Sequence, residues 1–67
     1  MITIELNGEP YKIGEQARLA ELIERLNLSR GRIAVEINQA VVPKAEYEDR
    51  VLKPGDKVEI INFVGGG

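Results

Sequence analysis

The chain is short, and its composition excludes several kinds of function. It has 67 residues, no cysteine and no histidine, and its 9 basic and 11 acidic residues give a net charge of −2. We expect one domain with a small core and no disulfide framework, thiolate metal cluster, cysteine nucleophile or catalytic triad within the chain. The slightly acidic balance argues against nucleic-acid binding. No apolar run approaches the roughly 20 residues that span a bilayer, and no secretory signal opens the chain, so we expect a cytoplasmic protein with no membrane partner.

The first elements predicted are the two strands of a hairpin. Residues 2–6 alternate between apolar and polar side chains, which is the period of a half-buried strand. Asn7-Gly8 follows directly and is a strong hairpin signal. Tyr11 to Ile13 reads as the returning strand, and Pro10 suits its start because proline cannot donate a ladder hydrogen bond.

An amphipathic helix is predicted next, from about Ala17 to Leu26. Its apolar stripe has the helical spacing i, i+3, i+4 and i+7 and comprises Leu19, Leu22, Ile23 and Leu26. No Ser, Thr, Asp or Asn stands where the helix begins, so packing must stabilise that end. At the other end Asn27 tolerates the left-handed conformation of a helix stop, and Leu28 can fold back on the stripe.

The second half of the chain predicts strands joined by turns. In chain order we expect a strand at residues 33–37, a turn at Asn38-Gln39, a short strand at Val41-Val42, one helical turn within Lys44–Arg50, a type II turn at Pro54-Gly55 and a last strand from about Lys57 to Val64. This order has no repeated βαβ unit and indicates an α+β domain over residues 1–64. We expect a mixed sheet of four to five strands with one helix packed on one face, as in the ubiquitin-like β-grasp fold. We expect residues 65–67 to form a flexible C-terminal glycine tail.

The last strand carries apolar residues on both faces. Val58 and Ile60 are in phase and face the helix, so Ile61 and Phe63 point to the opposite, solvent-facing side. Exposed apolar side chains beside the tail predict a docking patch for a partner protein. The alternatives are that single exposed apolar residues are ordinary, or that a β-bulge changes the phase.

The tail Gly65-Gly66-Gly67 has no side chains and is costly to order. It can pass through a narrow channel and carry the terminal carboxylate into another protein's active site. That carboxylate is ionised at neutral pH and is a competent nucleophile towards the α-phosphate of ATP, which would give an acyl-adenylate that accepts sulfur. The alternative is a frayed terminus or a cloning remnant, since disorder collects at termini.

Several segments together resemble the ThiS family of sulfur carriers of the thiamin pathway. They are GDKVEIINFVGGG at residues 55–67, VEIN at 35–38, VVP at 41–43, the opening Asn7-Gly8 and the leucine-rich helix, so the resemblance covers the whole chain. It implies that the protein is not an enzyme and binds no cofactor. A ubiquitin-activating-like adenylating enzyme would use ATP to activate the terminal carboxylate, a persulfide donor would convert it to a thiocarboxylate, and thiazole synthase would take the sulfur into the thiazole ring.

The resemblance also assigns roles to residues at the C-terminus. Gly67 is the residue that is adenylated and thiolated, Gly66 completes the glycine pair, and Gly65 is an extra glycine of the tail. Ile61, Phe63 and Val64 are expected to bind the partners.

Other functions remain open from the sequence. Carriers for molybdopterin synthesis or tRNA thiolation share the fold and the terminal glycines, and a ubiquitin-like modifier of lysines would use the same acyl-adenylate. A regulatory or RNA-binding module would need a basic surface that the composition does not offer. The carboxylates Glu46, Glu48 and Asp49 and the basic loop at residues 29–32 are read as solvated surface.

Overall fold

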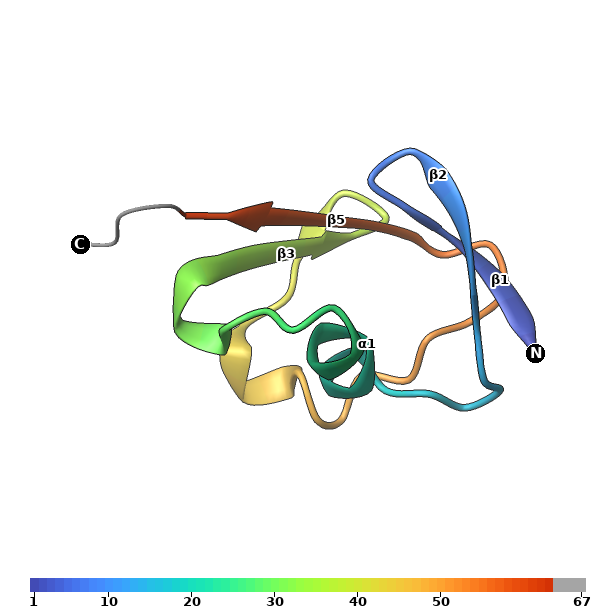
Figure 1. The fold of residues 1–67 in the computed structure, drawn as a ribbon, viewed down its shortest axis with the longest axis horizontal. Helices are drawn as coiled ribbons and strands as arrows, with labels where there is room; N and C mark the ends of the chain where they lie inside the picture. The colour runs from blue at the N-terminus through green and yellow to red at the C-terminus, as the bar shows by residue number, and fades with distance from the viewer. Residues whose placement is uncertain (64–67) are drawn as a thin grey trace.

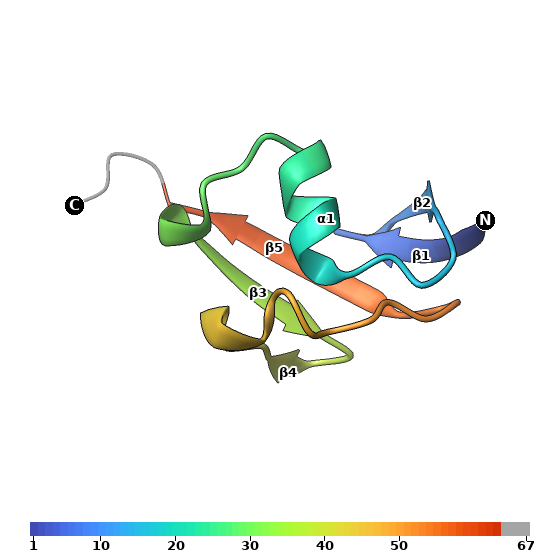
Figure 2. The ribbon, with the colours of Figure 1, turned by 90° about the horizontal axis from the view of Figure 1, so that it is seen from below.

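Five strands form one mixed sheet in the order β2-β1-β5-β3-β4 (Figure 1). The computed structural model describes residues 1–63. The strands are β1 (Ile2–Leu6), β2 (Glu9–Ile13), β3 (Ile33–Ile37), β4 (Ala40–Val41) and β5 (Lys57–Asn62), with the helix α1 (Leu19–Arg25) and the 3-10 turns η1 (Arg30–Arg32) and η2 (Lys44–Glu46). β1 and β5 are parallel and the other neighbours are antiparallel. Figure 2 shows α1 lying across one face of this sheet, so the predicted α+β architecture is confirmed.

The β1–β2 hairpin turns at Asn7-Gly8, as predicted. Both residues have positive φ, 49° at Asn7 and 86° at Gly8, as a two-residue type I′ turn requires. The returning strand begins at Glu9 rather than Tyr11, and Pro10 lies within it opposite Glu5. Proline is tolerated there because β2 is an edge strand, whose outer side needs no ladder donor.

Backbone carbonyls from a later segment hold the start of α1. The helix begins at Leu19, two residues after the predicted start, and its N-cap Arg18 makes no side-chain capping bond. Instead the N–H of Leu19 donates to Arg50 O at 2.8 Å, and that of Ala20 donates to Tyr47 O at 2.8 Å. The packing that the sequence required at this end is therefore supplied by residues 47–50, which satisfy two of the free N–H groups.

The end of α1 follows the prediction closely. Asn27 has φ 57°, its N–H donates to Glu24 O, and the N–H of Leu28 donates to Ile23 O at 3.2 Å. This pair of bonds is a Schellman motif. It turns the chain back, so that Leu28 packs against the core.

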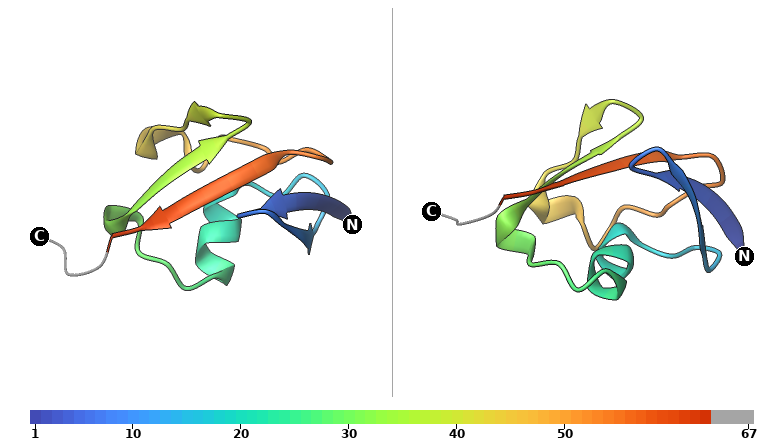
Figure 3. Two further views of the ribbon diagram at one scale, coloured as in Figure 1. Left: turned by 90° about the horizontal axis from the view of Figure 1, so that it is seen from above. Right: turned by 45° about the horizontal axis from the view of Figure 1, so that its top comes forward.

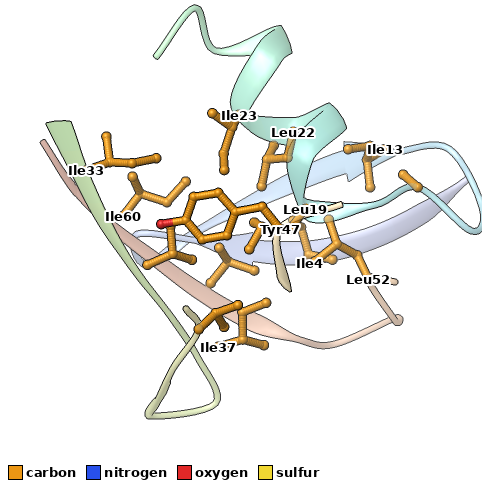
Figure 4. Close-up of a cluster of buried hydrophobic side chains, with 14 residues drawn as sticks. Ile4, Ile13, Leu19, Leu22, Ile23, Ile33, Ile37, Tyr47, Leu52 and Ile60 are labelled. Carbon is orange, nitrogen blue, oxygen red and sulfur yellow. The ribbon is translucent and has the colours of Figure 1, made fainter. Parts of the chain in front are cut away.

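The core lies between α1 and the sheet (Figure 4). The buried side chains, shared between helix, strands and loops, are Ile4, Ile13, Ala17, Leu19, Leu22, Ile23, Ile33, Val35, Ile37, Val42, Tyr47, Leu52, Val58 and Ile60. Tyr47 is 1% exposed although it belongs to a segment that reads as polar. No helix within residues 1–63 has the length and apolar character needed to cross a membrane.

The remaining turns also match their sequence signals. Asn38 and Gln39 have φ of 53° and 73° and connect β3 to β4. β4 covers Ala40–Val41, one residue earlier than predicted, because this two-residue turn pairs Ile37 with Ala40. Gly55 has φ 83°, as the third position of the predicted type II turn requires.

Candidate functional site at the end of β5

The start of β5 is fixed by a hydrogen-bond network around Asp56. This carboxylate is buried and accepts from Asn38 Nδ2 at 3.0 Å and from the N–H of Lys53 at 2.9 Å. Asn38 Oδ1 accepts from the N–H of Lys57 at 3.0 Å. Two loops that are distant in sequence thus hold the beginning of the central strand in place.

The register of β5 decides which of its side chains face solvent. β5 pairs with β3 from Ile37↔Val58 to Ile33↔Asn62 without a bulge. Val58 and Ile60 point into the core at 0% and 8% exposed, whereas Ile61 and Phe63 are 59% and 51% exposed. The predicted outward phase of these two residues is confirmed, and the β-bulge alternative is wrong.

A neighbour on β3 explains why Ile61 remains uncovered, and a neighbour in η1 extends the pairing of β5. Ala34 stands directly opposite Ile61, and its methyl side chain covers little of the larger residue. The N–H of Phe63 donates to Arg32 O at 2.6 Å, so pairing with the β3 side extends one residue past the end of the strand.

Asn7 is a structural residue of this site that the sequence analysis treated only as a turn signal. Its N–H donates to Val58 O at 2.8 Å, its Oδ1 accepts from the N–H of Ile60 at 2.8 Å, and its Nδ2 lies 3.4 Å from Ile60 O. The side-chain amide therefore takes the place of one more β1 residue beside β5. The turn signal gave no indication of this contact, because it spans almost the whole chain.

The solvent-facing side of the sheet is acidic beside these apolar residues. Glu36 and Glu59 stand directly opposite each other on β3 and β5. Like charges in such a pair destabilise a sheet by about 0.2–1 kcal/mol. Glu5 is better placed, because its β5 neighbour is Lys57.

Four of the predicted site residues lie outside the described residues: Val64, Gly65, Gly66 and Gly67. Their roles in partner binding, adenylation and thiolation therefore remain predictions. The carboxylates at Glu46 and Asp49 are exposed, and Glu48 forms an ion pair with Arg30 at 3.0 Å on the surface. Within residues 1–63 no group of three acidic side chains is arranged to hold a metal ion.

Comparison with known proteins gives consistent results. The family model described as "ThiS family" matches residues 4–67. A sulfur carrier protein ThiS of Thermus thermophilus is 36% identical over 92% of this chain and 95% of its own length. A thiazole synthase of Magnetococcus marinus is 39% identical over 96% of this chain, which corresponds to 20% of that synthase. The crystal structure of a thiamine biosynthesis protein (ThiS) from Geobacter metallireducens superposes with a TM-score of 0.82 and 29% identity, covering 98% of this chain and all of that one.

Proposed function

The chain belongs to the ThiS family of sulfur carriers, and from this premise we propose that Gly67 carries sulfur as a thiocarboxylate for thiazole formation in thiamin biosynthesis. It is a carrier and not an enzyme. The observation that supports this proposal most directly is the end of β5, where the exposed Ile61 and Phe63 lead directly into the tail.

The chemistry proceeds in three steps at the terminal carboxylate. An oxygen of Gly67 attacks the α-phosphorus of ATP on a ubiquitin-activating-like adenylating enzyme, releasing pyrophosphate and forming an acyl-adenylate. The outer sulfur of a cysteine persulfide then attacks the acyl carbon and displaces AMP. A thiol cleaves the resulting S–S bond, which leaves the thiocarboxylate on Gly67 and a disulfide on the donor. The body of the carrier contributes neither a nucleophilic thiol nor an imidazole base, since the sequence has no cysteine and no histidine.

Thiazole synthase is the acceptor that we propose for this sulfur. The relative from Magnetococcus marinus that is called a thiazole synthase contains a segment matching almost this whole chain. The presence of a carrier-like segment and a thiazole synthase in one polypeptide fits a functional association between carrier and synthase. It favours thiamin synthesis over molybdopterin synthesis or tRNA thiolation.

Intact mass spectrometry tests the central step. Incubation with the cognate adenylating enzyme, ATP and a persulfide donor should replace one oxygen of the carrier by sulfur, and deletion of Gly67 should abolish the change. An unchanged mass, with the adenylating enzyme active on another carrier, would contradict the proposal. Transfer to thiazole synthase but not to the large subunit of molybdopterin synthase would support the thiamin assignment, and the reverse result would overturn it.

The docking patch, defined as Ile61 and Phe63, has a matched control in Val41. Each is an exposed apolar residue, and Val41 is the most exposed of the three at 72%, but it lies on β4 and is separated from β5 by β3. We expect Phe63→Ser and Ile61→Ser to weaken binding of the adenylating enzyme at least tenfold, because burial of such a side chain contributes about 1.5–3 kcal/mol. Val41→Ser should leave the Kd unchanged. Equal effects from all three variants would contradict a patch located beside the tail.

A further inference from the structure

The turns of the β1–β2 and β3–β4 hairpins each contain an asparagine whose side chain bonds to β5. Asn7 Oδ1 accepts from the N–H of Ile60 at 2.8 Å, and Asn38 Oδ1 accepts from the N–H of Lys57 at 3.0 Å. Both asparagines begin a two-residue turn in which the two residues have positive φ. Figure 3 shows the β1–β2 hairpin and β3 on opposite sides of β5. The two amides therefore bond to β5 from its two sides.

The turns differ in the residue that follows the asparagine. Asn7 is followed by Gly8 and Asn38 by Gln39, and no other asparagine of the chain precedes a glycine. An asparagine loses its amide when the backbone nitrogen of the next residue attacks its Cγ, and glycine permits this attack because it has no Cβ to hinder the approach. Asn7 and Gly8 are exposed, and a Cβ built on Gly8 would meet nothing within 4 Å, so water reaches this turn.

We propose that Asn7 is a deamidation site and that its bond to β5 protects it while the body is folded. The nitrogen of Gly8 loses its proton and bonds to Asn7 Cγ, and the Cγ–Nδ2 bond breaks with release of ammonia. One water then opens the resulting succinimide at either of its carbonyls. The products are aspartate and an isoaspartyl residue, in which the main chain runs through Cβ and Cγ. Water is the only co-reactant, and the inference does not depend on the proposed function.

Two features of the fold keep Asn7 Cγ away from the nitrogen of Gly8. The amide is held against β5 by the bond to the N–H of Ile60 and by the approach of Nδ2 to Ile60 O at 3.4 Å. A type I′ turn also has ψ of about +30° at its first central residue, which places the next nitrogen nearly opposite Cβ, whereas the succinimide ring needs both on the same side. The reaction therefore requires the turn to open and to leave β5.

Either product weakens the edge of the sheet that the turn completes. The isoaspartyl form adds a carbon to the main chain inside a two-residue turn, and the length of this turn fixes the hairpin register. Aspartate keeps an acceptor for the N–H of Ile60 but directs a carboxylate oxygen towards Ile60 O, where the amide placed a donor. β1 itself pairs with β5 only at Glu5 and Leu6. Deamidation thus converts a transient opening of this edge into a permanent loss of folded carrier.

Peptide mapping of the full chain, folded in buffer or unfolded in guanidinium chloride at the same pH, tests the proposal. The map separates the asparagine, aspartate and isoaspartyl forms of residue 7. We expect Asn7 to convert at least tenfold more slowly in the folded protein, because the reactive state is then populated only by opening. Equal rates in the two states would contradict the protection, and an Asn7 that stays intact in the unfolded chain would contradict the site.

Asn38 is the matched control within the same chain. It has the same turn geometry and the same kind of bond to β5, but Gln39 hinders the attack, so it should stay largely intact even when the chain is unfolded. Gln39→Gly should make Asn38 convert about as fast as Asn7 in the unfolded chain and at least tenfold more slowly in the folded one. Conversion of Asn38 at the unfolded rate in a folded Gln39→Gly variant would overturn protection by β5.

Refolding of the isolated isoaspartyl form tests the consequence. After removal of denaturant it should fail to regain the circular dichroism spectrum of the wild-type carrier, whereas unmodified chain treated in the same way should regain it. An isoaspartyl form that refolds and unfolds at the wild-type Tm would show that modification of this turn does not remove carrier from the folded pool.

Discussion

Replacement of Asn7 by alanine removes the side chain that completes the β1–β5 ladder. The N–H of Ile60, a residue 8% exposed, loses its acceptor, and an unsatisfied buried donor costs about 1–3 kcal/mol. Alanine must also adopt the φ of 49° found at this position, which L-residues other than Asn and Asp rarely adopt. We therefore expect a loss of about 2 kcal/mol in the free energy of unfolding. With an unfolding entropy of about 2.1 cal/mol/K per residue, this corresponds to a decrease in Tm of about 14 °C for a chain of this length.

Two further substitutions separate the hydrogen bonds from the backbone conformation. Asn7→Gly adopts the positive φ freely but loses both side-chain contacts, and Asn7→Asp keeps an acceptor for the N–H of Ile60 while losing the weaker contact at 3.4 Å. Stability should decrease in the order wild type, Asp, Gly, Ala.

Thermal unfolding followed by circular dichroism measures this order, and hydrogen exchange locates the effect. The Ile60 amide should exchange faster in Asn7→Gly and Asn7→Ala than in Asn7→Asp. If Asn7→Ala unfolds at the wild-type Tm, the side chain is not a functioning part of the ladder and our reasoning about this edge of β5 is wrong.

Three smaller predictions follow from other positions. Gln39→Gly should raise the free energy of unfolding by about 0.5–1 kcal/mol in urea titrations, because glycine relieves the φ of 73°; a loss of stability would contradict this account of the turn. Glu36→Lys should replace the repulsion with Glu59 by an attractive pair and gain up to about 1 kcal/mol, and the gain should shrink in 1 M salt, whereas a salt-independent change would exclude an electrostatic cause. Asp56→Ala should lose about 2 kcal/mol, since the carboxylate accepts from Asn38 and a backbone N–H; unchanged urea denaturation would show that this network does not stabilise the protein.

Local signals in the sequence were sufficient for the order of elements. Alternation of apolar and polar residues identified the strands, and the apolar stripe with helical spacing identified the helix. The Asn-Gly and Pro-Gly pairs identified turns. Each of these signals acts over a few neighbouring residues, so each can be read from the sequence. The outward phase of Ile61 and Phe63 followed in the same way, from simple alternation along a strand that has no bulge.

Contacts that are distant in sequence were not predictable in this way. The capping of α1 by the carbonyls of Tyr47 and Arg50 and the role of Asn7 beside Ile60 depend on how separated segments meet in space. Tyr47 lies in a segment of mostly charged residues, so its burial also depends on the helix and sheet that surround it. The pairing of β5 with both β1 and β3 has the same origin.

The place of β5 in the sheet has a consequence for how the protein folds during synthesis. β5 is the last strand along the chain and yet lies in the middle of the sheet, between β1 and β3. Its parallel pairing with β1 joins the two ends of the chain, and contacts of this kind form late because the intervening loop must close first. A chain that stops before β5 cannot complete the sheet, so we expect such a truncated product not to fold. Folding of the body therefore requires that synthesis has passed β5, the strand that leads into the glycine tail.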